Sequence, residues 1–441
     1  MTLWILIPAS VCGLLYGLKS PRYLRLFFIG LLILFLAWHT VPVMRAHLTD
    51  RGWTGLSDID PYGWATHAVY KHHEDPHGKK GWLSFPFPVF PVLWAVSRGG
   101  TLPGPLWKVH FFYLNLVLAF VSGILFYLPV WMSDKKNIFG LFSGLPFVLL
   151  FMFSEGTART LSQGQVNLMV AFFLGGAVCF LAYFLEHRSG SHLSLAMTGM
   201  LLALALLTKL IVLPVFLFFL FRTAAQFTGF PGKKKPLRLS TESWIMLYTV
   251  VFALLAILGT VLMPGGISFD HYIGFFKKGA DMGVHDFLRR PMNFSPVAVL
   301  IRSGLVPEVP GLISFIMLII LIALASMRTI TPSRPLSVDL LPPWIYVTLL
   351  WAPISWSHYA CWSYGAFLIL LTRIGRLSYN GKRFILAFLL FLAFGLTSIR
   401  AHLLYLPGIL LLFLLSCLMP CEEDRSSSAS APGPAAIPSS S

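Results

Sequence analysis

The sequence predicts an all-α fold, a polytopic bundle of membrane-spanning helices. Of its 441 residues, 56% are hydrophobic and only 11% are charged, and the mean hydropathy is +0.76. A soluble domain has roughly 45–50% apolar residues. Apolar runs such as "LFFIGLLILFLAW" and "FILAFLLFLAFGL" recur along the chain. Because about 20 apolar residues cross the hydrocarbon core of a bilayer as a helix, we expect an integral membrane protein with about 11–13 transmembrane helices.

The apolar runs define the expected helices in chain order. They fall at 2–18, 23–43, 105–133, 137–154, 164–186, 193–223, 243–263, 309–327, 340–353, 358–372, 383–398 and 401–419. The run 193–223 would be about 46 Å long as one helix, which is longer than a hydrocarbon core of about 30 Å. Lys209 and Pro214 interrupt it. We therefore expect two shorter helices that meet at Lys209.

The positive charges between the apolar runs predict the orientation in the membrane. The segment "FRTAAQFTGFPGKKKPLRLS" carries five basic residues and no acid, which indicates a cytoplasmic loop. The two large loops, 44–104 and 264–308, then lie together on the non-cytoplasmic side, where they hold 9 of the 17 acids. We expect one membrane domain over 1–421 and a disordered cytoplasmic tail over 422–441, which is rich in Ser, Pro and Ala.

The charge and cysteine content exclude several classes of protein. The net charge is +16, but the basic residues sit in short loops, where they set topology and meet anionic lipids. We therefore expect membrane lipids as partners and no nucleic acid. The five cysteines are scattered without a CxxC pair, so neither a disulfide framework nor a zinc site is indicated. No cofactor is implied.

The first large loop contains the acidic stretch "SDIDPYGWATHAVY". A carboxylate of Asp58 or Asp60, partly desolvated at the membrane surface, could act as a general base for a hydroxyl acceptor. Alternatively, Asp60 caps a helix that lies in the interface, with Pro61 at its first position. One aspartate could serve each purpose.

The part of this loop from Ser57 to Trp82 has four histidines, which raises the question of a metal. His72 and His73 are adjacent and would point apart on a helix, and the stretch has no HxxE pair. We therefore expect a solvated polar loop here and no metal site. An oxygen-liganded Mg²⁺ or Mn²⁺ at Asp58 or Asp60 stays open as an alternative.

Two features at helix ends suggest ligand binding. In "TLSQGQVNLMV" the amides of Gln165 and Asn167 could hydrogen-bond a sugar or a phosphate, or tie two helices together. Lys209 lies inside an apolar run, and ionisable groups within membrane spans are costly and usually functional. A lipid phosphate is its expected partner, and snorkelling to the surface is the alternative.

Two later polar segments complete the set of candidates. The second large loop supplies Arg289, Arg290 and Asn293, on a cationic and aromatic surface that suits an anionic group joined to a greasy chain. Any one of these could instead be a topological or solvated residue. His358 in "SWSHY" could stack on a sugar, bond a phosphate, or satisfy a neighbouring helix end.

Together these segments resemble the GT-C superfamily of membrane glycosyltransferases. Within it, the order of "SDIDPYGWATHAVY", "FPFPVFP", "SQGQVNLMV", "LLTKLIVLP", "NFSPVAVLIR" and "SWSHY" is similar to glycosyltransferase family 87, the polyprenyl-phosphate-mannose-dependent α-mannosyltransferase type. The resemblance implies a GT-C helix bundle in a bacterial-type plasma membrane, with the active site on the non-cytoplasmic side. It departs from the family at Phe87, Phe294 and Ser357, where tyrosine, glutamine and an acid are common.

The resemblance also implies a reaction. A hexose, expected to be mannose, would pass from a polyprenyl-phosphate-sugar donor to a hydroxyl of a glycolipid or glycan. Asp58 matches the catalytic aspartate, and Lys209, Gln165, Asn167 and His358 match positions near the donor's phosphate and sugar. A lipid-linked sugar flippase or transporter is the alternative function, although such proteins tend to have internal repeats and none is evident in this sequence.

Overall fold

The structure is a computed structural model, and it describes residues 5–18, 20–45, 92, 95–96, 104–133, 144–187, 192–228, 239–262, 288–290, 293–331, 334–352, 355, 357–377, 381–398 and 402–419. Within these ranges it has fifteen α-helices, three short 3₁₀ segments and no strand. The predicted all-α fold is therefore confirmed.

Every predicted apolar run contains at least one of these helices. They are α1 (Leu6–Gly17), α2 (Arg22–Arg45), α5 (Gly104–Ser133), α6 (Gly144–Met152), α7 (Glu155–Gln163), α8 (Asn167–Glu186), α9 (His192–Thr208), α10 (Leu213–Thr228), α11 (Thr241–Leu262), α14 (Pro296–Arg302), α15 (Pro310–Thr329), α16 (Pro342–Leu350), α17 (Tyr364–Arg376), α18 (Gly381–Thr397) and α19 (His402–Leu418). The 3₁₀ segments are η4 (Leu210–Val212), η5 (Val338–Leu340) and η6 (Ser357–Ser363).

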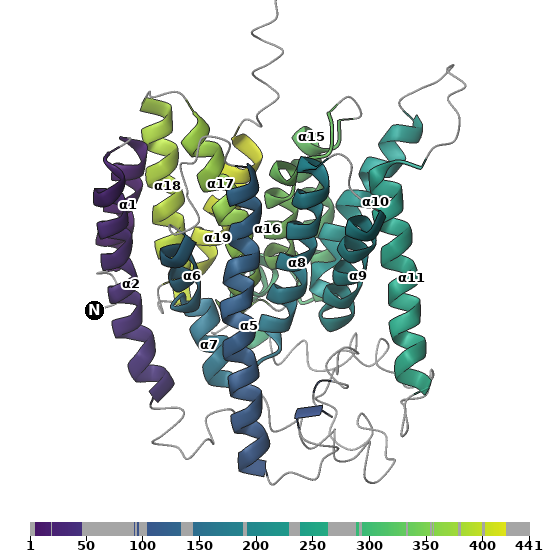
Figure 1. Ribbon diagram of the computed structural model, residues 1–441, viewed down its shortest axis with the longest axis horizontal. Coiled ribbons are helices and arrows are strands. Elements are labelled where there is room, and N and C mark those ends of the chain that lie inside the picture. The colour runs from purple at the N-terminus through teal and green to yellow at the C-terminus, as the bar shows by residue number, and fades with distance from the viewer. Residues whose placement is uncertain are drawn as a thin grey trace, which may run out of the picture.

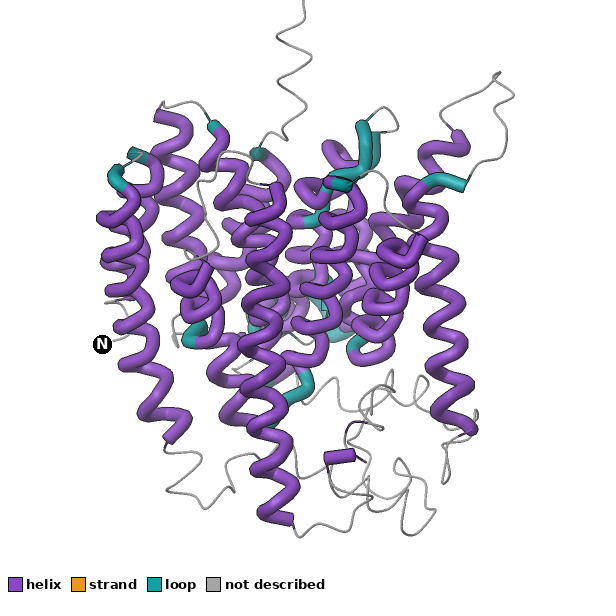
Figure 2. The backbone as a smooth tube through the Cα atoms, in the orientation of Figure 1, coloured by secondary structure: helices purple, strands orange, loops and turns teal. Residues whose placement is uncertain are grey.

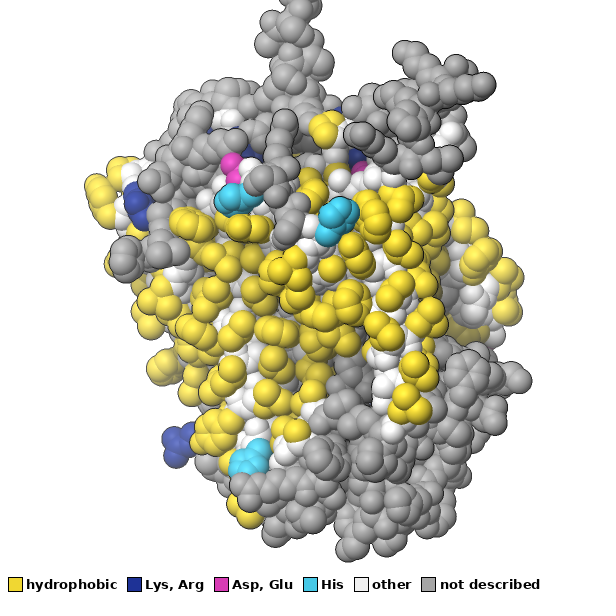
Figure 3. Space-filling model, turned by 45° about the vertical axis from the view of Figure 1, so that its right-hand side comes forward, with side chains coloured by type: hydrophobic (Ala, Val, Ile, Leu, Met, Phe, Trp, Pro, Cys, Tyr) yellow, Lys and Arg dark blue, Asp and Glu magenta, His cyan; other side chains and the backbone are white. Residues whose placement is uncertain are grey.

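Several helices are long and apolar enough to cross a membrane. Among the described residues there are six, which lie in α2, α5, α8, α10, α11 and α15, and four shorter apolar helices accompany them. Their outer surface is apolar as well: large hydrophobic side chains are exposed along α11 and α15. Figure 3 shows hydrophobic side chains over the middle of one face of the molecule. The chain is thus a polytopic integral membrane protein.

The helices run side by side as a bundle (Figures 1 and 2). On one edge α1 packs on α18, and on the other α9 packs on α11, with α5 and α8 paired between them. Glycines permit the closest contacts, as is usual between membrane helices. A Cβ at Gly13 would lie 2.7 Å from the Ala387 carbonyl oxygen, and one at Gly199 would lie 2.5 Å from Cβ of Tyr248.

The core is centred on α16, whose nine residues are all buried. Trp344 of this helix and Trp362 of η6 are fully buried, and their indole nitrogens donate to the hydroxyls of Thr329 and Thr348. A buried indole usually finds such a partner because an unpaired donor costs free energy. These bonds fix the α16–η6 region, on which the candidate site is built.

The ends of the helices agree with the predicted topology. In Figure 1, α2 ends, α5 begins and α11 ends at the lower side of the bundle, whereas α10 ends and α11 begins at the upper side. The helix ends that lead into the loops 44–104 and 264–308 thus share one side. Which side faces the cytoplasm remains a prediction, as do the limits of the membrane domain.

Candidate active site

Lys209 lies at a break between two helices, as predicted. Helix α9 ends at Thr208 and η4 begins at Leu210, while Lys209 itself has extended backbone angles, φ −150° and ψ 114°. Pro214 follows as the second residue of α10, a position where its missing N–H removes no helical bond. The indole nitrogen of Trp351 donates to the Ile211 carbonyl over 3.1 Å and holds the break against the end of α16.

The ammonium group of Lys209 turns toward η6. Its Nζ lies 4.1 Å from the centroid of the Tyr359 ring, which stacks on Trp362 with 5.1 Å between centroids. This is cation–π geometry. In the part of the chain that the structure describes, no carboxylate forms an ion pair with Lys209. The side chain is half-buried, so it places a positive charge at the helix break that no carboxylate of the described residues pairs with. The snorkelling alternative stays open.

His358 lies in η6 beside this lysine. It is 2% exposed, and its ring lies 4.8 Å from the Tyr359 ring at 76°. Its backbone carbonyl accepts a hydrogen bond of 3.3 Å from the Thr160 hydroxyl of α7. Lys209 and Arg159 lie close enough for their positive charges to act on the imidazole. Lys209 and His358, 149 positions apart in the sequence, therefore belong to one site.

The polar stretch 163–167 forms the turn between α7 and α8. Gly164 has φ 68°, and the chain then enters α8 at Asn167. The Asn167 side chain is fully buried, yet neither its amide nitrogen nor its amide oxygen has a hydrogen-bond partner among the described residues. The side-chain amide oxygen of Gln163 and the hydroxyl of Ser357 likewise have no hydrogen-bond partner among the described residues.

These unpartnered atoms help to decide between two interpretations of the stretch. Buried polar atoms are nearly always paired, so each exception requires an explanation. An Asn167 amide that tied two helices together would have a partner on the second helix, and it has none among the described residues. The helix-tying interpretation of Asn167 therefore lacks a partner among the described residues, and the ligand-binding interpretation stays a prediction. Gln165 is half-buried, and its backbone N–H donates to Thr160 over 3.1 Å.

Asn293 connects the end of the second large loop to the chain just before η6. Its side-chain oxygen accepts hydrogen bonds from the backbone N–H groups of Ser295 (3.1 Å) and Ser355 (3.0 Å). Phe294 adds a backbone bond of 2.8 Å to the Ser355 carbonyl. Asn293 thus positions the segment that leads into His358.

The arginines of the second loop lie at the surface. Arg289 forms an ion pair of 3.2 Å with Glu308, and its side chain is 74% exposed. Arg290 is also exposed. The described contacts of these two residues include Glu308 and Arg302. Asp58 and Asp60 lie outside the residues that the structure describes.

The sequence interpretation missed several residues of this site. Glu155 and Arg159 of α7 form a buried ion pair one helical turn apart, and Tyr359 and Thr160 hold the lysine and the His358 segment. The pair Glu155–Arg159 could have been recognised from "EGTAR", because two opposite charges spaced i, i+4 beside apolar runs indicate a helix with a paired polar face. Nothing in the sequence indicates the ring contact of Tyr359.

No metal centre is present among the described residues, where no group of three His, Cys, Asp or Glu side chains comes together. Four of the cysteines are described, and all four are free. The question of a divalent ion at Asp58 or Asp60 stays a prediction, because both residues lie outside these ranges.

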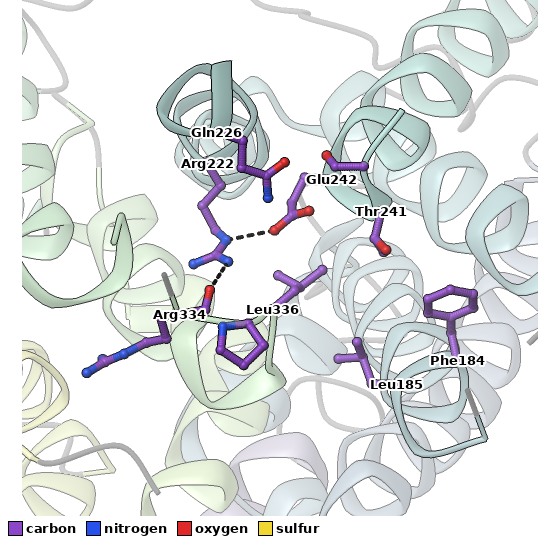
Figure 4. Close-up of a pocket in the computed structure, with 10 residues that line it drawn as sticks. Phe184, Leu185, Arg222, Gln226, Thr241, Glu242, Arg334 and Leu336 are labelled. Atoms are coloured by element: carbon purple, nitrogen blue, oxygen red, sulfur yellow. Dashed lines mark hydrogen bonds and ion pairs between the residues drawn. The ribbon is translucent and has the colours of Figure 1, made fainter. Parts of the chain in front are cut away.

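A cavity of about 640 Å³ lies at the other end of the bundle. It is bounded by the end of α8, the end of α10, the start of α11 and residues 334–336. In Figure 4, Arg222 is held between the Glu242 carboxylate (2.9 Å) and the Arg334 carbonyl (2.6 Å). None of the sequence-predicted site residues lines this cavity. Along α8 it is roughly 27 Å from Asn167.

Comparison with known proteins gives one match. A family model described as glycosyltransferase family 87 matches residues 85–353, which is more than half of the chain. The matched segment includes Gln165, Asn167, Lys209 and Asn293, whereas Asp58 and His358 lie outside it. Neither the search of curated proteins nor that of solved structures gives a match. The chain therefore belongs to glycosyltransferase family 87 and is a glycosyltransferase built into the membrane.

Proposed function

We propose that this enzyme moves a hexose from a polyprenyl-phosphate-sugar donor to a hydroxyl of a glycolipid or glycan. The hexose we expect is mannose. The site would face the non-cytoplasmic side of a bacterial-type plasma membrane. The observation that carries the proposal is the Lys209 cation at a helix break, next to Tyr359 and His358 and without a carboxylate partner among the described residues. A donor that is both anionic and lipid-linked matches a positive charge set inside a membrane domain.

The reaction requires that the leaving phosphate be stabilised. The bond between the sugar's anomeric carbon and the phosphate oxygen breaks, and polyprenyl phosphate leaves with the electron pair. A cation fixed in a low-dielectric site stabilises that developing charge far better than one in water. We assign this task to Lys209 and a supporting hydrogen bond to His358. Arg289 and Arg290, exposed at the surface, would meet the anionic head group as the donor enters.

The sugar ring needs hydrogen-bond partners. Among the described residues, the amide nitrogen and the amide oxygen of the buried Asn167 side chain have no hydrogen-bond partner. The Ser357 hydroxyl has none there either. Such groups reject ligands that lack matching hydroxyls, because the protein's own polar atoms would stay unpaired. We assign Asn167 and Gln165 to the hexose, and Asn293 to positioning the His358 segment.

The acceptor hydroxyl must lose its proton as the new bond to the anomeric carbon forms. By the family resemblance, Asp58 takes this proton as general base. Asp60, two residues on, is either a second catalytic carboxylate or the cap of the helix that follows.

The test is a transfer assay with radiolabelled polyprenyl-phosphate-mannose in membrane vesicles. We expect wild-type vesicles to label a lipid or glycan acceptor and Asp58→Asn vesicles to lose about 10²–10⁴-fold in rate, the usual contribution of a general base. Undiminished transfer by Asp58→Asn would reject the assigned base. Movement of the labelled donor across the membrane without transfer would favour the flippase, which membership of a glycosyltransferase family disfavours.

A further inference from the structure

The end of the bundle opposite Lys209 contains a cluster of arginines, one of which, Arg373, has too few acceptors among the described residues. Helix α17 follows η6 and runs away from His358, so that Arg373 lies fifteen positions later, roughly 22 Å along the helix. Arg373 and Arg376 form the last turn of α17. Positive charge at a helix C-terminus is favourable, which explains why the two arginines lie there. It does not explain why donors of Arg373 lack acceptors among the described residues.

Arg373 is buried, and the described residues do not supply acceptors for all of its donors. It is 4% exposed, and its Nε and Nη1 atoms have no hydrogen-bond partner among the described residues. The Oδ1 atom of Asp339 lies 4.0 Å from Nε, which is too far for a hydrogen bond. The Oδ2 atom of Asp339 lies 3.3 Å from Nη1 of Arg376. One carboxylate therefore lies between two guanidinium groups.

Two other arginines at this end differ in that the protein supplies acceptors for both of their terminal nitrogens, Nη1 and Nη2. Arg383 donates to the carbonyls of Gly375, Leu377 and Tyr16. Arg222 donates to Glu242 and to two backbone carbonyls. An arginine that serves only to cap helix ends would be satisfied in the same way. Unmet donors on a buried guanidinium instead indicate an absent partner, such as an ion.

Further positive charge surrounds Arg373. Arg328 of α15 donates to the Leu418 carbonyl at the end of α19 over 2.8 Å, and both Arg328 and Arg373 lie close enough to Cys417 of α19 for their charges to act on its thiol. Arg328 is exposed and Arg376 is partly exposed. The cluster therefore reaches the surface of the molecule through these two side chains, with Asp339 as its nearby carboxylate.

We propose that Arg373, together with Arg376 and Arg328, binds a phosphate group at a site distinct from the one at Lys209. Guanidinium forks bond phosphate oxygens in pairs, and an arginine is more weakly hydrated than a lysine, so its burial is less costly. The phosphate could belong to the head group of an anionic phospholipid or be free in solution. The assignment is independent of the proposed glycosyl transfer.

The test measures thermal unfolding of the purified, delipidated full chain in non-ionic detergent. One arm adds inorganic phosphate against chloride at equal ionic strength, and the other adds phosphatidylglycerol against phosphatidylcholine. At about 100 times the Kd, the bound ligand should raise the wild-type Tm by roughly 3 °C. Stabilisation by phosphate assigns a soluble ligand, and stabilisation by phosphatidylglycerol alone assigns a lipid.

The variants separate a ligand site from a structural ion pair. Arg373→Met should lose the shift and, without ligand, unfold at the wild-type Tm or above it, because an unmet buried charge is gone while Asp339 keeps Arg376. Arg376→Gln, at a partly exposed position, should also weaken the shift. Arg22→Gln, an exposed arginine at the start of α2, should keep it in full.

Three outcomes would overturn the site. The first is that neither ligand raises the Tm of the wild type, and the second is that Arg373→Met keeps the full ligand-induced rise in Tm. The third is that, without ligand, the Tm of Arg373→Met falls as far as that of Asp339→Asn. A shift that appears only after Glu422, Glu423 and Asp424 are replaced by amides would assign the cluster to the chain's own tail and overturn the phosphate site as well.

Discussion

Lys209 and Arg373 are both cations set into the helix bundle, yet their surroundings differ. Lys209 lies over an aromatic ring, which is a weak and replaceable partner. The proposed donor phosphate could approach Lys209 without breaking an ion pair among the described residues. Arg373 has a carboxylate nearby that it shares with Arg376. The first arrangement suits a group that arrives and leaves in each turnover, and the second suits a group that stays bound.

Two buried asparagines give a matched test of the site at the residue scale. Asn167 has no amide partner among the described residues, whereas Asn293 accepts two backbone hydrogen bonds. We expect Asn167→Leu to leave the free energy of unfolding within about 1 kcal/mol of wild type while kcat/KM falls about tenfold or more. Asn293→Leu should cost about 2–4 kcal/mol, because two buried N–H groups lose their acceptor. The measurements are denaturant or thermal unfolding and the transfer assay, and an equal loss of stability in both variants would contradict the assignment of Asn167.

At the scale of elements, the site depends on how α7 packs against η6. A Cβ at Gly156 would lie 2.9 Å from the Cys361 backbone nitrogen and 3.3 Å from the Ser357 carbonyl oxygen. The two elements therefore touch through their backbones at this glycine. Any side chain there must push η6, and with it His358 and Tyr359, away from α7.

This contact predicts a loss of activity from a small substitution. Gly156→Ala should lower kcat about tenfold or more, because a displacement of about 1 Å in a site can cost as much as 10²-fold, and the overpacking itself should cost about 1–3 kcal/mol. Gly259→Ala is the control. Gly259 lies in α11 with nothing within 4 Å of its added Cβ, so alanine should be neutral or slightly stabilising. Equal activities of the two variants in the transfer assay would show that the α7–η6 contact does not position the site.

Some helices could be predicted from the sequence and others could not. Apolar runs located each membrane helix, and the charge and proline in 193–223 located the break at Lys209, because bilayer thickness limits helix length. The short helix α7 was missed because its nine residues, EGTARTLSQ, are polar yet mostly buried. The hydrogen bond that the Ser355 backbone N–H donates to the Asn293 side chain joins residues 62 positions apart. No local sequence pattern predicts such a pairing.

At the scale of the whole molecule, the two ends of the bundle have different chemical character. One end contains the Lys209 site, with its unpartnered amide and aromatic rings. The other contains Arg222, Arg328, Arg373 and Arg376, with Glu242 and Asp339 between them. The predicted orientation places this second end on the cytoplasmic side.

The orientation can be tested by cysteine labelling in intact cells. In a variant without native cysteines, a cysteine in place of Ser303, beside α14, should react with a membrane-impermeant maleimide. A cysteine in place of Leu239, before α11, should react only after the cells are opened, and so should one added after Ser441. Both Ser303 and Leu239 are exposed, so burial does not explain a difference between them. Labelling of the Leu239 position from outside would reverse the topology and move the site to the cytoplasmic face.

The most direct test of the account is the affinity of purified enzyme for polyprenyl phosphate, compared with polyprenol of the same chain length. If Lys209 meets the leaving phosphate, Lys209→Met should weaken the binding of polyprenyl phosphate by about 10–100-fold, equivalent to about 1.4–2.8 kcal/mol. It should leave the binding of polyprenol unchanged. Lys209→Arg, which keeps the charge, should retain part of the preference for the phosphate. An unaltered preference for polyprenyl phosphate over polyprenol in Lys209→Met would contradict the central claim.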